Sequence, residues 1–157
     1  MVGKVREDTG DSPFPRMPAV GAGYLRFFDL SRDLRPFFER YAERYMAGDA
    51  EGVAAEMYEA PFLAVRGGSP IHLADRAAVV SHLAQVMGAY RDSGAAVAEV
   101  AGLDVVEQGD SAALATVRWI VRSQTGDVLK DFRTSYQLAG PDPWHVLSYV
   151  NHDTVRR

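Results

Sequence analysis

Residues 112–138 read AALATVRWIVRSQTGDVLKDFRTSYQL, and this stretch decides the fold. Two runs of alternating apolar and polar residues flank Thr125-Gly126, a pattern that predicts a β-hairpin with a two-residue turn. The predicted pairs on one face are Trp119 with Phe132, Val117 with Thr134, Ala115 with Tyr136, and Ala113 with Leu138. Because all are apolar or mildly polar, this face is expected to pack on helices, and a slip of two residues would keep it intact.

The opposite face of the hairpin is polar. It carries Arg118, Arg122, Asp131, Arg133, Ser135 and Gln137. Asp131 is the sole carboxylate within the two strands, and its outward position beside Arg118 and Arg133 predicts a surface ion pair rather than a catalytic acid. Apolar Leu114, Ile120 and Leu129 on the same face favour contact with a second copy of the chain, so a homodimer through the outer sheet face is expected.

Further elements can be placed outward from the hairpin. Strands over Val97–Val106 and Trp144–His152 would complete an antiparallel meander of four strands. Upstream, helical spacing of apolar residues predicts one helix from an N-cap at Asp33 to Gly48, and a short second helix from Asp49 through Tyr58, closed by Pro61. A small hairpin over 62–65 and 71–73 follows, and then a helix capped by Asp75 that ends at Gly94.

Composition limits both domain count and partners. A chain of 157 residues fits one domain, expected over 33–157, whereas frequent Gly and Pro predict an extended or partly disordered arm over 1–32. The net charge is -4 and Lys occurs only twice, which argues against a nucleic-acid footprint, and no apolar run reaches membrane-spanning length. The absence of Cys fits a reducing cytoplasm, which is the expected location.

The order of these elements resembles the nuclear transport factor 2-like superfamily, close to its SnoaL-like and ketosteroid-isomerase-like branches. The resemblance lies in Phe37-Phe38-Glu39-Arg40-Tyr41 through Ala47-Gly48-Asp49, in Leu73-Ala74-Asp75-Arg76-Ala77-Ala78-Val79, and in Trp144-His145-Val146-Leu147-Ser148-Tyr149-Val150. It implies an α+β fold in which a curved antiparallel sheet wraps around three N-terminal helices, a cystatin-like cone with an internal pocket. Members of the superfamily hold small molecules there, and dimers through the outer sheet face are common among them.

Aromatic and hydroxyl side chains would line such a pocket. The candidates are Trp119, Phe132, Thr134 and Tyr136 from the sheet, Tyr41, Tyr45 and Tyr58 from the helices, and His72 at the mouth. Rings with polar tips suit a small apolar or aromatic ligand that carries one or two oxygens. The alternative interpretation is that these residues form an ordinary core with satisfied hydroxyls.

The isomerases and cyclases of the superfamily move a proton next to a carbonyl, which requires a base and an oxygen-binding donor. No carboxylate faces inward in the two central strands, so His is the remaining base. If residues 144, 146, 148 and 150 face inward, His152 does too, and His145 then faces outward. On that parity we expect His152 as base and Tyr136 as donor, whereas His82 belongs at the border of its helix.

Three functional hypotheses remain. The first is a small-molecule-binding domain with no assignable reaction, the second is a cofactor-independent isomerase or cyclase with a His base and a Tyr donor, and the third is a protein-interaction module. No cofactor is expected. The His spacing fits no dedicated metal site, and the phosphate-loop and nucleophile-elbow motifs are absent from the sequence.

Overall fold

The computed structural model describes residues 20–152, with only the backbone described at 20–29, 31 and 32. The described residues form three helices and six strands. In chain order these are α1 (Val20–Met46), α2 (Ala50–Glu56), β1 (Tyr58–Arg66), β2 (Ser69–Leu73), α3 (Arg76–Asp92), β3 (Ala95–Glu107), β4 (Ala112–Ser123), β5 (Val128–Ala139) and β6 (His145–Asn151). No helix in this part of the chain combines the length and the apolar character needed to cross a membrane.

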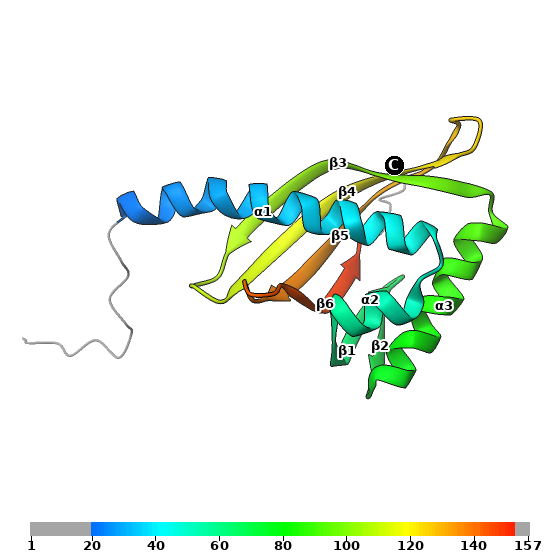
Figure 1. Ribbon diagram of the computed structural model, residues 1–157, viewed down its shortest axis with the longest axis horizontal. Coiled ribbons are helices and arrows are strands. Elements are labelled where there is room, and N and C mark those ends of the chain that lie inside the picture. Colours follow the sequence, from blue (N-terminus) through cyan, green and yellow to red (C-terminus); the bar gives the residue numbers. More distant parts are fainter. Residues whose placement is uncertain (1–19, 153–157) are drawn as a thin grey trace, which may run out of the picture.

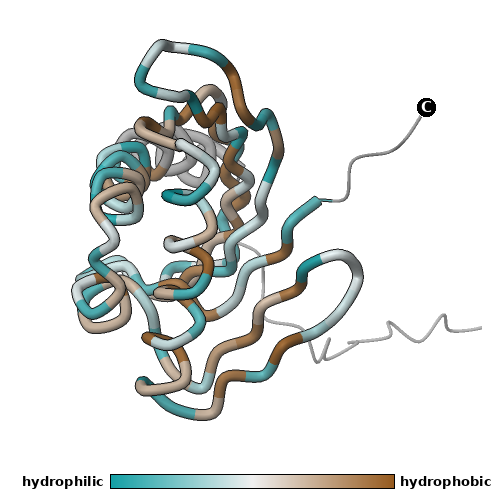
Figure 2. The backbone as a smooth tube through the Cα atoms, turned by 90° about the vertical axis from the view of Figure 1, so that its right-hand side faces the viewer, coloured by the Kyte–Doolittle hydropathy of each residue, from teal (hydrophilic) through white to brown (hydrophobic). Residues whose placement is uncertain are grey.

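The six strands form one curved sheet in the order β2-β1-β6-β5-β4-β3. Figure 1 shows α1 lying across the sheet, with α2 and α3 beside the end that holds β1 and β2. In Figure 2, turned by 90°, the helices gather on one side of the curved strands. The predicted α+β fold, helices within a curved sheet, is confirmed.

The prediction of a wholly antiparallel sheet is wrong at one pair of neighbours. β6 inserts between β1 and β5 and runs parallel to β1, with Leu63 opposite Ser148 and Val65 opposite Val150. The remaining neighbouring pairs are antiparallel. The final strand thus closes the gap between the early hairpin and the late meander, so segments far apart in the chain share one sheet.

The central hairpin has the predicted register. Trp119 lies opposite Phe132, and Ala115 lies opposite Tyr136. The turn differs, however, because Ser123 N–H donates to the Asp127 carbonyl at 2.9 Å, which leaves a three-residue loop over 124–126. A bulge between Val128 and Lys130 restores the predicted pairing further along the strands.

The first helix starts earlier than predicted. α1 begins at Val20, so Asp33 lies within the helix and is not its N-cap. Residues 20–32, predicted as part of an arm, are therefore helical, whereas the remainder of that arm (1–19) lies outside the described residues. The last proline of the predicted arm is Pro18, so no proline prevents a helix from starting at Val20. The glycines that follow weaken a helix by only about 1 kcal/mol each.

The second helix is shorter than predicted. Asp49 is confirmed as its cap, since Oδ1 accepts a hydrogen bond from Gly52 N–H at 3.0 Å. The helix ends at Glu56, and Tyr58 already pairs with Val146 of β6. Pro61 does not close the helix; it lies inside β1, where a register shift between 58 and 63 accommodates a residue without an N–H.

The core lies between the helices and the concave face of the sheet. Leu34 and Phe38 of α1 are fully buried, as is Val117 of β4. Phe38 packs its ring against Trp119 and Tyr136, with centroid separations of 6.3 and 4.9 Å. The predicted inward face of the hairpin is therefore the face that α1 covers.

Candidate functional site

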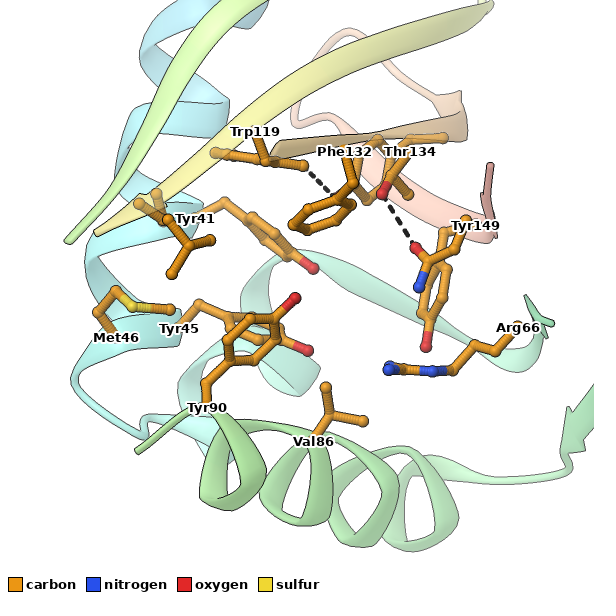
Figure 3. Close-up of a pocket in the computed structure, with 15 residues that line it drawn as sticks. Tyr41, Tyr45, Met46, Arg66, Val86, Tyr90, Trp119, Phe132, Thr134 and Tyr149 are labelled. Carbon is orange, nitrogen blue, oxygen red and sulfur yellow. Dashed lines mark hydrogen bonds between the residues drawn. The ribbon is translucent and has the colours of Figure 1, made fainter. Parts of the chain in front are cut away.

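A cavity opens between α1, α3 and the concave face of the sheet (Figure 3). It encloses about 480 Å³ between its lining atoms, the open mouth included, and about 50 Å³ of this space can hold the centre of a water molecule. Its lining is Tyr41, Ala42, Tyr45, Met46, Arg66, Val86, Tyr90, Ala98, Trp119, Val121, Phe132, Thr134, Tyr136, Tyr149 and Asn151. The space is therefore suited to a compact molecule.

Secondary structure brings the aromatic walls together. Tyr41 and Tyr45 are four residues apart on α1, so both rings lie on one helix face, with centroids 5.3 Å apart. Trp119 and Phe132 face each other across the β4·β5 pair, while Tyr90 reaches the cavity from α3 and meets Tyr45 at 6.0 Å. Four elements thus supply one aromatic enclosure.

Six of the sequence-predicted site residues line this cavity. They are Tyr41, Tyr45, Trp119, Phe132, Thr134 and Tyr136. The alternation rule that placed the four sheet residues inward holds through the centre of the hairpin. Their position is established by the structure, whereas a role in binding stays a prediction.

Two predicted ligand-binding residues lie elsewhere. Tyr58 is buried behind the cavity wall, where its hydroxyl lies 2.8 Å from the hydroxyl of Tyr41 and its ring stacks on Phe62 at 4.4 Å. His72 is exposed on β2 and does not cover the mouth, because alternation along this short strand turns Ile71 and Leu73 towards the core and His72 away.

The inward orientation predicted for His152 is wrong. Ser148 pairs with Gln137 but Val146 pairs with Leu138, so Leu147 is an extra residue in β6 and reverses the alternation. His152 is exposed on the outer face, where its Nε2 lies 2.7 Å from the Ser135 hydroxyl. Tyr136 lines the cavity, but the expected catalytic pair of His152 and Tyr136 does not form.

Sequence reasoning missed the polar end of the cavity. Arg66 is the last residue of β1, one position beyond the strand predicted from apolar residues. Tyr149 and Asn151 enter the lining because of the bulge at Leu147, which no pattern in the sequence marks. Tyr90 lies within the helix predicted to run from Asp75 to Gly94, but it was not predicted as a cavity residue.

The buried end of the cavity is a network of phenols. Trp119 Nε1 donates to the Tyr136 hydroxyl at 3.0 Å, and the Tyr41 and Tyr58 hydroxyls share a hydrogen bond. Burial raises the pKa of Tyr41, Tyr58 and Tyr136, with neighbouring phenols adding to the rise for Tyr41. These phenols are neutral at physiological pH and offer hydroxyl groups rather than charges.

The other end is more polar. The Thr134 hydroxyl donates to Asn151 Oδ1 at 2.9 Å, and His82 Nε2 lies 2.7 Å from the Tyr149 hydroxyl. Burial raises the pKa of Tyr149, and the Arg66 guanidinium opposes that rise. Burial and then Arg66 lower the pKa of His82, so its imidazole is neutral at neutral pH.

Charged groups are few around this site. Among the described residues, no three His, Asp or Glu side chains gather in a way that could hold a metal ion. Arg66 supplies the positive charge of the lining, and no carboxylate lines the cavity. Asp131 lies on the outer face, as predicted, where Arg118 pairs with both of its oxygens at 2.9 and 2.7 Å.

Comparison with protein families gives a match over residues 32–154 to a family described as NTF2-like protein (DUF6841). The chain belongs to this NTF2-like family. The match runs from the middle of α1 to just beyond β6 and includes every element that lines the cavity. No curated protein matches this NTF2-like chain.

Solved structures share the NTF2-like fold. An NTF2-like protein with a cystatin-like fold from Novosphingobium aromaticivorans is 21% identical, covers 83% of this chain and 85% of its own, and has a TM-score of 0.63. Aln2 from a Streptomyces species is 19% identical, covers 87% of this chain and 94% of its own, and has a TM-score of 0.63. An NTF2-like superfamily protein from Salmonella enterica is 12% identical, covers 82% of this chain and 94% of its own, and has a TM-score of 0.61. At these identities the likeness concerns the fold alone.

Proposed function

We propose that this NTF2-like domain binds a compact small molecule, apolar or aromatic in its body, within the cavity between α1, α3 and the sheet. The observation that carries the proposal is an aromatic enclosure with polar groups at one end. Cavities of this kind bury an apolar ligand and orient it through a few hydrogen bonds.

The cavity sets the size of the ligand. The space open to water-sized spheres, about 50 Å³, suits a molecule of a few heavy atoms unless side chains move. Tyr45 is half-buried and lies against Tyr90, so rotation of these two rings is the simplest way to admit a larger ligand. A single aromatic ring is accordingly the ligand size that we favour.

Native mass spectrometry of the freshly purified protein tests this proposal. A small molecule that remains bound under native conditions and is released on denaturation would support it. Ala98→Phe fills the cavity from β3, whereas Ala101→Phe adds the same ring at an exposed position of that strand. Retention by Ala101→Phe but not by Ala98→Phe would locate the ligand; equal retention by both variants would count against the cavity.

A second candidate function is proton transfer without a cofactor. The observation that favours it is the hydrogen bond between His82 and Tyr149, because it joins a phenol that lines the cavity to a neutral imidazole. Tyr149 would then donate a hydrogen bond to the substrate carbonyl oxygen while His82 sets the orientation of the phenol, and a water molecule would take the α-proton, because no carboxylate or imidazole of the described residues lines the cavity. Exchange of the α-protons of phenylacetone in D2O, followed by NMR, tests this reaction class. If the unmodified protein exchanges these protons no faster than the Tyr149→Phe variant does, the reaction is rejected for this probe.

We propose in addition that the domain forms a homodimer through the outer sheet face. Val97, Val106 and Val150 are 49, 56 and 41% exposed on that face, and the predicted contact residues Leu114 and Ile120 are half-buried on it. Sedimentation equilibrium at micromolar concentration should give twice 17.2 kDa. A single species at 17.2 kDa would contradict the dimer.

A further inference from the structure

Arg66 occupies an unusual position for a cation. It ends β1, where its backbone pairs with Ser69 of β2, and its side chain lines the cavity. Figure 3 shows the guanidinium directed into the cavity, near the Tyr149 hydroxyl and facing Tyr45, Tyr90 and Val86 across the open space. A strand terminus beside a Gly67-Gly68 turn thus fixes a positive charge against aromatic walls.

Arg66 has no carboxylate partner within the described residues, and its burial makes that notable. Three of the described arginines are half-buried: Arg44, Arg66 and Arg122. Arg44 pairs with Glu56 at 2.7 Å and Arg122 pairs with Glu99 at 3.1 Å. Partial removal of a guanidinium from water costs free energy that an opposite charge normally offsets. For Arg66, the phenols of the cavity are the polar groups at hand.

The groups beside Arg66 are suited to an oxyanion. Asn151 accepts from Thr134 through Oδ1, which leaves its amide N–H groups to donate. The Tyr149 hydroxyl is held by His82 on the same side of the cavity. These donors and the guanidinium fork match the planar geometry of a carboxylate.

We infer that the ligand of this cavity is a small organic monoanion, an aromatic or otherwise compact carboxylate whose charged end contacts Arg66 and whose apolar body lies among the aromatic rings. The inference rests on the proposed function and names the ligand class. Arg66 is the one cation among the described residues that line the cavity. The Lys130 ammonium lies nearby, 5.0 and 6.0 Å from the ring centroids of Tyr90 and Phe132, but is not part of the lining, so the lining matches one negative charge rather than two. The neutral state of His82 supports the same count.

Isothermal titration calorimetry with benzoate, phenylacetate and butyrate, and with benzamide as the neutral counterpart of benzoate, tests the inference. We expect one of the carboxylates to bind about tenfold or more tightly than benzamide. Arg66→Gln should remove that advantage by weakening the binding of the carboxylate far more than that of benzamide. Arg133→Gln removes the same charge from the exposed outer face and should leave every affinity unchanged.

Arg66→Lys separates charge from geometry and should recover part of the advantage, because an ammonium keeps the charge but loses the planar fork. Circular dichroism of each variant checks that the fold is retained. Benzamide binding as tightly as each of the three carboxylates, or an Arg66→Gln variant that still prefers the carboxylate, would overturn the inference and leave the proposed function standing. Failure of all three carboxylates to bind at millimolar concentration would also overturn it, and native mass spectrometry would then decide the proposed function separately.

Discussion

The hydroxyl of Tyr149 lies 2.7 Å from Nε2 of His82, and this contact joins the last strand of the sheet to α3 across 67 positions of the chain. The two rings also stack, with centroids 6.1 Å apart. The contact fixes the position of a cavity phenol from outside the cavity, since His82 itself is not part of the lining.

The lowered pKa of His82 makes stability depend on pH. Burial and Arg66 disfavour the imidazolium in the folded state. The imidazole in the unfolded chain, with its ordinary pKa of 6.5, therefore takes up a proton at a higher pH than it does in the folded protein. Stability is therefore full above that pH and falls as the pH decreases through the folded pKa. In urea unfolding at pH 7.5 and about pH 5, His82→Gln should lose less stability than the unmodified protein. His72→Gln, at an exposed position, is the control; an unchanged pH dependence in His82→Gln would refute the assignment.

The buried hydrogen bond between Tyr41 and Tyr58 should appear as coupling between their substitutions. Each hydroxyl satisfies the other at 2.8 Å, and the two side chains are 6 and 4% exposed. Tyr41→Phe or Tyr58→Phe leaves one hydroxyl without this partner and should cost about 1–2 kcal/mol in the free energy of unfolding. The double variant should cost less than the sum by about 1 kcal/mol, as measured by denaturant unfolding. Additive losses would show that the contact contributes nothing.

Gly140 should not tolerate a methyl group. A Cβ there would lie 2.7 Å from Cε3 of the buried Trp144 ring and 3.0 Å from the Pro143 carbonyl oxygen. Gly140→Ala must displace that ring or the turn, so we expect a loss of about 1–3 kcal/mol in thermal or urea unfolding. Gly102→Ala is the matched strand control, since its Cβ would make an ordinary 3.5 Å contact with Arg118. Equal effects of the two variants would contradict this account.

Gly88 should gain from the same substitution that harms Gly140. It lies within α3, where the nearest atom to an added Cβ would be Arg91 Nη2 at 3.6 Å. Gly88→Ala should raise the free energy of unfolding by about 0.5–1 kcal/mol through helix propensity. Gly94, just past the helix, has φ of +83°, so Gly94→Ala should instead lower it by about 1 kcal/mol. The opposite signs, read from melting temperatures, are the test.

Alternation predicted the central hairpin because each strand buries one face and exposes the other. Trp119, Phe132, Thr134 and Tyr136 were placed from period two alone, and their register is observed. The rule tolerates an error in the turn, which is why the pairing was correct although the loop has three residues. Capping residues with local chemistry, Asp49 and Asp75, were likewise readable from the sequence.

The misplaced residues share a physical cause. His152 and Tyr149 exchanged faces because one extra residue in β6 is invisible to a pattern that assumes uninterrupted alternation. Arg66 was overlooked because a charged residue at a strand end reads as solvent-exposed, whereas its position depends on how β1 pairs with a strand over eighty residues later. Non-local pairing decides both, and no local pattern encodes it.

The extra residue at Leu147 makes the lining of the cavity depend on the bulge in β6. Deletion of Leu147 would bring Val146 and Ser148 into consecutive register opposite Leu138 and Gln137, and Tyr149 and Asn151 would keep the faces that they now occupy. Loss of the bulge without loss of a residue would instead shift the pairing by one, so that Val150 and His152 would face the cavity and Tyr149 and Asn151 would face solvent. Alignments of relatives that ignore a gap in β6 would therefore compare residues from opposite faces of the sheet.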